Sequence, residues 1–413
     1  RVKRDTVIGN IVKGGINMVD IESKIAALRC AWVNRLIYLE GNWKMIFEEQ
    51  LETMGLDFNI LLRSYFRSEK KLSSDIEINP FYIEIFKYFH TCKDYFCINK
   101  MTDDSILSQV IWLNEHFISK GKCLYFKNWV KSGFMYIKDL FDENGKWLRE
   151  NCVISRLSNK HNWMCEYLLI KKIVGKVCLS VDTKRAKYIN IKKTEAYFIH
   201  NNKFCFIKDK KSRYFYDILI EKKFKNPPVQ YEWNEKFKSL NLEIDWKNVY
   251  TQKIILMSNY SKKLAEFNYK LLNGIVVCGN LLYKWNKNIS KYCVYCGEVE
   301  NTKHLLFLCQ RINQIWSFFS QLMCVDIKWK HILLGFSQNC NENQFRNIII
   351  AIVIRCIFVE RIKCYNLVDD NYKNTDILTV VKEHIWLNKK TSELSYINRK
   401  WASNFQRLTN KMI

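Results

Sequence analysis

Apolar residues recur at helical spacing through most of the chain. Between residues 25 and 39 they return every three or four positions, which is typical of one face of an α-helix. The same spacing predicts further helices at 43–66, 81–89, 163–174, 214–223, 261–272, 312–323, 345–364 and 377–386. Asp20 or Ser23 is expected to cap the first helix, because a short side-chain oxygen can accept hydrogen bonds from its free amides.

The period changes to two in the middle of the chain. β-forming and polar residues alternate at 176–180, 188–191 and 204–207, which predicts short strands in a small sheet. Residues that break helices are scarce, with 3 Pro and 13 Gly in 413 residues. The sequence therefore predicts a mainly α, multi-lobed helical protein with a small β element in its middle.

The charge of the chain indicates a polyanionic partner. The sequence has 66 Lys and Arg against 41 Asp and Glu, a formal net charge of +25. A field of this sign attracts polyanions, and nucleic acid, either RNA or DNA, is the commonest of these. An AT-rich genome also favours Lys, Asn, Ile, Tyr and Phe, so compositional bias alone is the alternative. The hydrophobic fraction of 48% is ample for a packed core.

The cysteines and the hydropathy bear on the compartment. The 16 cysteines are scattered, unlike those of small disulfide-stapled domains. The charged start has no apolar run behind it, so no signal peptide is expected. The most apolar stretch, 348–359, is too short to cross a bilayer and carries Arg355, which indicates a buried helix. We expect a reduced, intracellular protein without a membrane partner, and the absence of an initiator Met suggests a fragment.

Four metal-ligand residue types follow one another at a spacing typical of zinc: Cys293-x2-Cys296-x7-His304-x4-Cys309. Zinc prefers four sulfur and nitrogen ligands in a tetrahedron. The C-x2-C turn would supply two sulfurs, Gly297 would let backbone amides approach them, and a helix-like turn would supply the other pair. Four protein ligands leave no position for a catalytic water, so we predict one structural Zn²⁺ in a CCHC zinc knuckle. Buried free thiols are the alternative.

Two basic groups are candidates for nucleic-acid contacts. Three thiolates, a neutral imidazole and Zn²⁺ sum to a charge of −1, so contacts near the metal must come from its neighbours Lys284, Lys287, Lys291, Lys303 and Arg311. In the segment 203–225, basic residues alternate with Phe and Tyr, which suits single-stranded nucleic acid. The candidates in that segment are Lys203, Lys208, Lys210, Lys211 and Arg213. Alternatively, its rings face the core and its lysines are simply solvated.

The sequence around the cysteines resembles the zinc-binding domain of non-LTR (LINE-type) retrotransposon reverse transcriptases. The resemblance is carried by Phe267-Asn268-Tyr269-Lys270-Leu271-Leu272, Leu282, Trp285, the four ligands, Gly297, Glu300, His304-Leu305-Leu306-Phe307 and Trp316. Val294 and Asn301 depart from the family pattern, but neither is a ligand. Upstream, Lys13-Gly14-Gly15-Ile16-Asn17-Met18-Val19-Asp20 resembles the segment after the polymerase palm of these enzymes, where the thumb begins.

The residue patterns and this resemblance together divide the chain into five segments. They are a thumb-like helical segment (1–66), a helical connector (67–174), a small basic β/α segment (175–228), a zinc-binding domain (229–340) and C-terminal helices (341–413). The Pro227-Pro228 pair is the clearest boundary. The implied role is to position RNA template or target DNA together with the remainder of the polymerase, and the family favours the nucleus. A decayed or repurposed remnant that acts as a structural or protein-interaction scaffold is the alternative.

The sequence offers no candidate for catalysis. A reverse transcriptase needs a Tyr/Phe-x-Asp-Asp turn for its metal ions, and none is found. Val368-Asp369-Asp370 is the nearest match, but it follows the zinc motif and is interpreted as a solvated loop. A second metal site at His90, Cys92 and Cys97 lacks a fourth ligand. We therefore expect a non-enzymatic chain.

Overall fold

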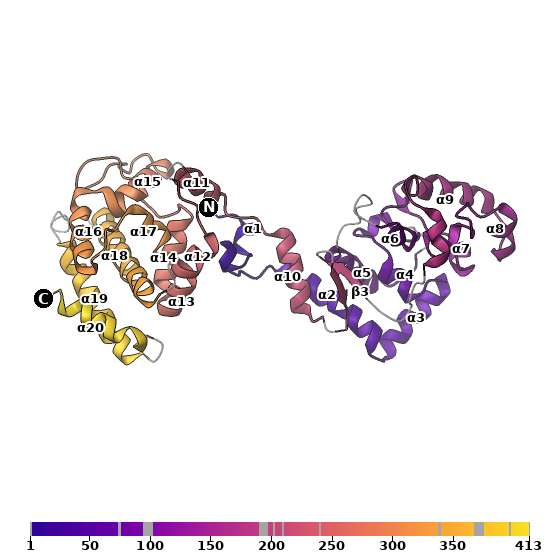
Figure 1. Ribbon diagram of the computed structural model, residues 1–413, viewed down its shortest axis with the longest axis horizontal. Helices are drawn as coiled ribbons and strands as arrows, with labels where there is room; N and C mark the ends of the chain where they lie inside the picture. The colour runs from indigo at the N-terminus through magenta and orange to yellow at the C-terminus, as the bar shows by residue number, and fades with distance from the viewer. Residues whose placement is uncertain are drawn as a thin grey trace. The chain divides into compact units, whose positions relative to one another are not determined.

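The computed structural model describes residues 2–72, 76–93, 102–189, 197–200, 203–208, 210–238, 241–337, 340–366, 376–395 and 398–412. The chain is mainly helical, with two small two-stranded sheets (Figure 1). It forms two compact units. One unit combines Arg1–Met18 with Phe224–Ile413, and the other consists of Val19–Lys223. We call them the terminal unit and the middle unit.

The middle unit is built around helices that share one hydrophobic core. Its helices are α2 (Ile21–Tyr38), α3 (Asn42–Met54), α4 (Phe58–Arg63), α5 (Pro80–Cys92), α6 (Asp103–Leu107), α7 (Lys127–Lys131), α8 (Glu150–Arg156), α9 (Trp163–Val177) and α10 (Ser212–Lys223). Gly55, at a φ of 71°, ends α3, so the helix expected over 43–66 is two helices. An isolated pair of strands, β1 (Ile118–Ser119) and β2 (Lys122–Cys123), is antiparallel.

Helix α2 forms where the apolar spacing predicts a helix, but most of that apolar stripe is half exposed and a different face is buried. The Asp20 side chain caps it by accepting a hydrogen bond from the Ser23 amide at 3.2 Å. The buried Asp20 carboxylate also pairs with Lys223 Nζ at 2.8 Å, which ties the start of α2 to α10. The buried face of α2 packs on α5 and α10, and its side chains are Ala26, Ala27, Cys30, Val33 and Leu36.

The small β element is confirmed in one of its three expected places. Strands β3 (Tyr197–His200) and β4 (Lys203–Phe206) form an antiparallel hairpin. The strand expected at 176–180 is wrong, because α9 continues to Val177. Tyr167, Ile170, Val174 and Val177 are buried at helical spacing, so burial of one helical face outweighs the local alternation. Of the strand expected at 188–191, Tyr188 ends a 3-10 turn and 190–191 lie outside the described residues.

The terminal unit holds a second hydrophobic core. Its helices are α1 (Arg4–Val7), α11 (Pro228–Lys238), α12 (Trp246–Tyr250), α13 (Leu256–Tyr260), α14 (Lys262–Leu272), α15 (Gly279–Trp285), α16 (Gln310–Met323), α17 (Trp329–Leu334), α18 (Asn341–Asn366), α19 (Ile377–Leu394) and α20 (Ala402–Asn410). Two π-helical turns, Thr251–Ile255 and His304–Leu308, interrupt the regular helices. The expected helices at 312–323, 345–364 and 377–386 are confirmed, and each is longer than predicted.

Helix α18 is the centre of the terminal unit. The run from Ile348 to Ile354 is buried on every side, as expected for a helix that is apolar all round. It contacts α14, α17, α19 and the π-helical turn at His304–Leu308. The predicted buried helix at 348–359 is therefore confirmed, and it supports the segment that carries the metal ligands.

Lys253 gives the terminal unit a pH-dependent stability. Its side chain is fully buried, its Nζ donates to the Ile332 carbonyl at 2.7 Å, and burial lowers the pKa of Lys253 to about 7. The unfolded lysine has a pKa of about 10.4. Between these values the unfolded state binds more protons, so this group makes the free energy of unfolding rise with pH.

We expect Lys253→Met to stabilise the protein at pH 7 by about 1–4 kcal/mol, since it removes a buried charge. The advantage should shrink as the pH approaches 10, where the wild-type lysine is neutral in the folded state. Urea denaturation at pH 7 and pH 9 measures the difference, with the exposed Lys238→Met as the control. An advantage that is equal at both pH values contradicts this assignment.

Candidate metal centre

The structure brings the four predicted ligands together. The sulfur atoms of Cys293, Cys296 and Cys309 and a ring nitrogen of His304 all lie within 4.8 Å of one another. Cys293 Sγ is 3.9 Å from Cys309 Sγ, and Cys296 Sγ is 3.2 Å from His304 Nε2. Bonds of about 2.0–2.3 Å around a tetrahedral zinc place ligand atoms about 3.5–3.8 Å apart. The cluster therefore has the size of a four-coordinate metal site.

The first two ligands lie on a tight hairpin. The Cys293 amide donates to the Glu298 carbonyl at 2.7 Å, and the Gly297 amide donates back to the Cys293 carbonyl at 2.9 Å. Gly297 has a φ of 75°, a left-handed conformation that favours glycine. The Glu298 amide hydrogen-bonds to the Cys296 sulfur. Gly297 thus lets the chain turn so that an amide approaches a ligand sulfur, as its position after C-x2-C predicts.

The other two ligands are joined by a π-helical turn. In an α-helix, residues five apart point about 140° away from each other, so His304 and Cys309 would not share a face. In the structure, His304–Leu308 forms a π-turn, and the Cys309 amide donates to the His304 carbonyl at 3.1 Å. Each hydrogen bond of a π-helix spans one residue more than in an α-helix, and this wider turn brings both ligand atoms to the same side. The expected helix-like turn is present, but it is π-helical.

The imidazole of His304 is held by neighbouring polar groups. Its Nδ1 lies 3.4 Å from a carboxylate oxygen of Glu298, while Nε2 faces the sulfur cluster. A carboxylate on the second ring nitrogen is typical of metal-bound histidines, because it fixes the ring orientation. The backbone amide of His304 donates to the side chain of Asn301 at 2.8 Å. Asn301, which departs from the family pattern, thus caps the helical segment that begins at residue 302 and leads into the π-turn.

The thiols differ in their readiness to ionise. The hydrogen bond between Cys293 and Cys309 lowers the pKa of Cys309 and raises the pKa of Cys293 to about 12. Desolvation raises the pKa of Cys296. A bound dication favours thiolates at all three, and metal binding therefore releases protons.

A buried ion pair joins the metal hairpin to α18. The Glu300 carboxylate contacts Nε of Arg361, and both side chains are almost completely buried. Glu300 also accepts a hydrogen bond from the Gly279 amide at 2.8 Å, which fixes the start of α15. The guanidinium groups of Arg311 and Arg361 lie 4.7 and 5.4 Å from the ring centroid of Tyr295, a residue that stands between the first two ligands in the sequence. No pattern in the sequence indicated this role for Arg361, because it is one of several charged residues in the second half of α18.

The predicted nucleic-acid residues of the terminal unit are mostly exposed. Lys284, Lys287 and Lys303 are exposed, and Lys291 and Arg311 are half-buried. The ammonium groups of Lys287 and Lys291 lie 4.1 and 5.7 Å from the ring centroid of Tyr283. Two cations and an aromatic ring therefore gather next to the metal hairpin.

The predicted residues of the middle unit surround the β3–β4 hairpin and α10. Lys208, Lys211 and Arg213 are exposed, Lys210 is half-buried, and the Lys203 side chain lies outside the described residues. Among the interleaved rings, Phe215 is fully buried and Phe206 is 52% exposed. Of the two alternatives for this segment, rings in the core and rings at the surface, Phe215 fits the first and Phe206 the second.

Among the described residues, the other metal candidates form no second site. His90 is buried, with its Nε2 2.8 Å from the Leu61 carbonyl and its Nδ1 accepting from the Phe66 amide at 3.2 Å. Cys97 and Val368-Asp369-Asp370 lie outside the described residues. Where the structure describes the chain, the four-ligand cluster is the one group of three or more Cys, His, Asp or Glu side chains with ligand geometry.

No protein-family model matches the chain, and no curated protein is significantly similar to it. Within the described segments, no helix has the length and apolar character needed to span a bilayer.

Proposed function

We propose that this chain is a non-catalytic, zinc-containing module that binds nucleic acid and corresponds to the C-terminal region of a non-LTR retrotransposon reverse transcriptase. The observation that carries the proposal is the convergence of Cys293, Cys296, His304 and Cys309 within 4.8 Å. Three thiolates and an imidazole form a donor set that suits zinc. Four protein ligands close the coordination sphere, so the metal would stabilise the fold rather than act on a substrate.

The charge next to the cluster supports the nucleic-acid part of the proposal. Lys287, Lys291 and Tyr283 place ammonium groups against an aromatic ring beside the hairpin that carries Cys293. Cations neutralise phosphates and rings stack on bases, and proteins that bind single strands combine the two. The module would hold RNA template or target DNA for a polymerase whose catalytic residues lie outside this sequence.

The salt dependence of binding tests this function. Zinc-loaded protein should bind labelled single-stranded RNA or DNA, and the affinity should fall steeply as salt is raised, because each neutralised phosphate releases counterions. The double variant Lys284→Gln/Lys287→Gln should lower the slope of log K against log salt by about 1.4, at roughly 0.7 per phosphate contact. The exposed pair Lys262 and Lys263, changed in the same way, serves as the control.

Absence of binding at low salt, or an equal loss of slope in both double variants, contradicts the proposal.

A protein-interaction scaffold is the second candidate, favoured by one observation. Ile21, Ile25 and Leu28 form an apolar stripe on α2, and each is at least half exposed. Such a stripe is typical of a surface that another protein covers.

A further inference from the structure

A groove lies between α19 and α20 in the terminal unit, away from the four metal ligands in the sequence. It has a cavity of about 520 Å³, lined by Thr379, Lys382, Trp386, Leu387, Lys390 and Met412 among others. This volume falls within the range of small-molecule and cofactor sites, about 300–1,000 Å³. The groove is therefore large enough to take a planar ring and part of its substituent.

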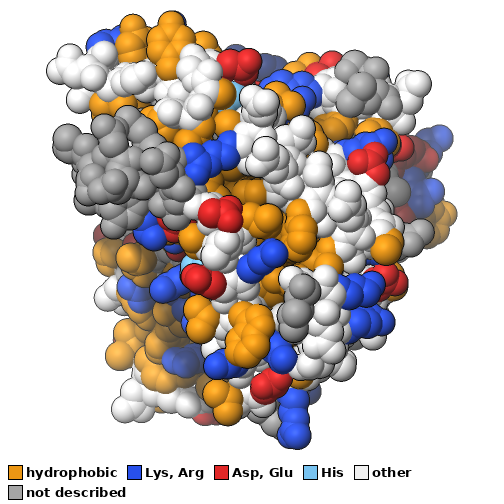
Figure 2. Space-filling view, turned by 90° about the vertical axis from the view of Figure 1, so that its left-hand side faces the viewer, with side chains coloured by type: hydrophobic (Ala, Val, Ile, Leu, Met, Phe, Trp, Pro, Cys, Tyr) orange, Lys and Arg blue, Asp and Glu red, His pale blue; other side chains and the backbone are white. Residues whose placement is uncertain are grey.

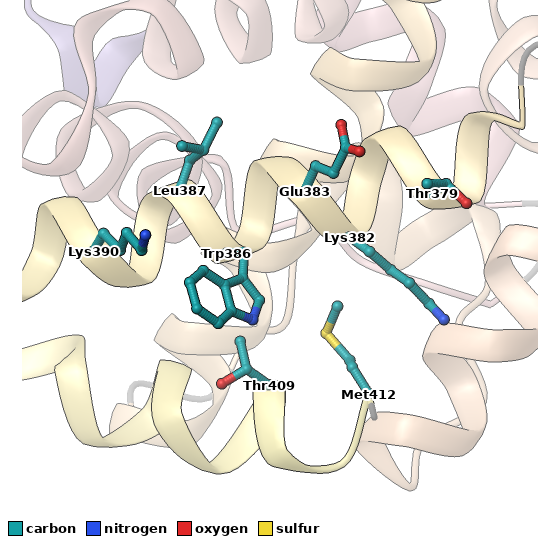
Figure 3. Close-up of a pocket in the computed structure, with 8 residues that line it drawn as sticks. All are labelled: Thr379, Lys382, Glu383, Trp386, Leu387, Lys390, Thr409 and Met412. Atoms are coloured by element: carbon teal, nitrogen blue, oxygen red, sulfur yellow. The ribbon is translucent and has the colours of Figure 1, made fainter.

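The groove exists because α19 uses its opposite face for packing. Ile377, Val381 and Ile385 are buried, and α19 contacts α18. Trp386 and Leu387, on the other side, remain 45% and 56% exposed. In Figure 3 the Trp386 indole points toward Thr409 and Met412, at the end of α20 and just beyond it. A large aromatic side chain thus stays accessible on the wall of a concave, mostly apolar surface.

Positive charge surrounds this indole. The ammonium groups of Lys389 and Lys390 lie 5.3 and 4.9 Å from the Trp386 ring centroid. Lys382, one helical turn earlier, holds its ammonium 4.8 Å from the ring centroid of Phe318. Glu383 also lines the cavity, with its carboxylate pointing away from the indole (Figure 3). The indole is therefore flanked by cations along the helix.

The wider surface has the same character. Between residues 377 and 412 the sequence has seven Lys and Arg against two Glu. Figure 2 faces the side on which α19 and α20 lie in Figure 1, and Lys and Arg side chains stand there among hydrophobic ones, with some Asp and Glu between them. Hydrophobic and aromatic surface set in a positive field complements an anionic polymer that carries flat rings.

We propose that this groove binds a single-stranded segment of nucleic acid, with one base stacked on Trp386 beside Met412 and the adjacent phosphates on Lys382 and Lys390. The inference rests on the proposed nucleic-acid function and adds a second contact surface to it. Stacking on an aromatic side chain combined with lysine–phosphate contacts is the physical basis of sequence-tolerant single-strand binding.

The test compares two fluorescently labelled oligonucleotides of equal length, one of thymidines and one of abasic sites. Fluorescence anisotropy at fixed low salt measures their binding to the zinc-loaded, 413-residue chain. Wild type should prefer the thymidine strand. Trp386→Ala should weaken thymidine binding about tenfold and leave abasic binding unchanged, because it removes one stacking contact. Tyr231→Ala, which removes an exposed aromatic ring on α11, should change neither.

A second variant tests the phosphate contacts. Lys382→Gln/Lys390→Gln should lower the slope of log K against log salt by about 1.4 for both strands, because both carry phosphates and this effect does not depend on stacking against Trp386. If wild type binds neither strand, this inference and the proposed function both fail. If wild type binds but Trp386→Ala retains its preference for bases, or loses affinity for both strands equally, only the groove assignment fails. Self-association that Trp386→Ala abolishes, with oligonucleotide binding unchanged, would assign the groove to a second copy of the chain instead.

Discussion

Replacing His304 with Ala is expected to release the metal and unfold the segment around it. The hairpin at 291–300 has few backbone hydrogen bonds of its own, so we expect residues 280–320 to loosen when the metal is lost. In small peptides, zinc sites of this type contribute about 10–16 kcal/mol of binding free energy, and binding is coupled to folding. Hydrogen exchange should therefore show near-complete loss of amide protection at 291–309.

The loss should extend from these residues into the hydrophobic core of the terminal unit. Leu305 and Leu306 are buried, and the Leu306 carbonyl accepts a hydrogen bond from the Trp316 indole at 2.8 Å, so the π-turn is part of the core. Free zinc at a thousand times its dissociation constant stabilises the folded state by about 4 kcal/mol. For a unit of this size we expect the Tm to fall by about 10 °C without the metal.

The matched control for this variant is His384→Ala, which removes an exposed histidine on α19 in the same unit. Its exchange pattern and Tm should equal those of wild type. Helix α2, in the middle unit, serves as an internal reference in both proteins. If His304→Ala keeps wild-type protection at 291–309 in the presence of a chelator, the metal does not hold this segment.

The second large effect is expected at the ion pair of Glu300 and Arg361. Replacing Arg361 with Met leaves the Glu300 carboxylate buried without its guanidinium, and breaking a buried pair in this way costs about 3–5 kcal/mol. Urea denaturation of zinc-loaded protein measures the loss. The affinity for zinc should also fall, because Glu300 lies between the second and third ligands and positions the hairpin against α18.

A double variant separates the charge effect from the packing effect. Glu300→Gln/Arg361→Met removes both charges and keeps an acceptor for the Gly279 amide, so it should recover a large part of the lost stability. Lys270→Met, which breaks the exposed pair with Glu266 on α14, should cost no more than about 1 kcal/mol. An Arg361→Met effect as small as that of Lys270→Met contradicts a structural role for the buried pair.

The helices and the ligand set could be predicted from the sequence because both depend on local spacing. Apolar residues at helical intervals predict α2, α16 and α19, and in α16 and α19 these residues are the buried ones. In α2 the face that carries Ile25 and Leu28 is half exposed, and the smaller side chains of Ala26, Ala27 and Cys30 are buried instead. The four ligands follow from residue type and spacing alone, since zinc chemistry restricts both. The conformation of Gly297 could also be predicted, because a glycine directly after the second cysteine is typical of a left-handed turn.

The remaining features depend on contacts between distant parts of the chain. The alternation at 176–180 indicates a strand, yet burial of Val174 and Val177 against the core extends α9. The π-turn at His304–Leu308 brings two predicted ligands five residues apart to one side, which an α-helix does not do, and the residue spacing alone does not distinguish the two kinds of helix. Arg361 meets Glu300 across 61 positions, and no local pattern records such a pairing.

The most direct test of the account is the metal content of the purified chain. Native mass spectrometry should find one zinc ion per wild-type protein and none in Cys296→Ser, which removes the exposed ligand of the cluster with the least disturbance to the core. Cys324→Ser, at an exposed cysteine outside the cluster, should keep one zinc. A wild-type chain without zinc, or a Cys296→Ser variant with an unchanged metal count, contradicts the assignment.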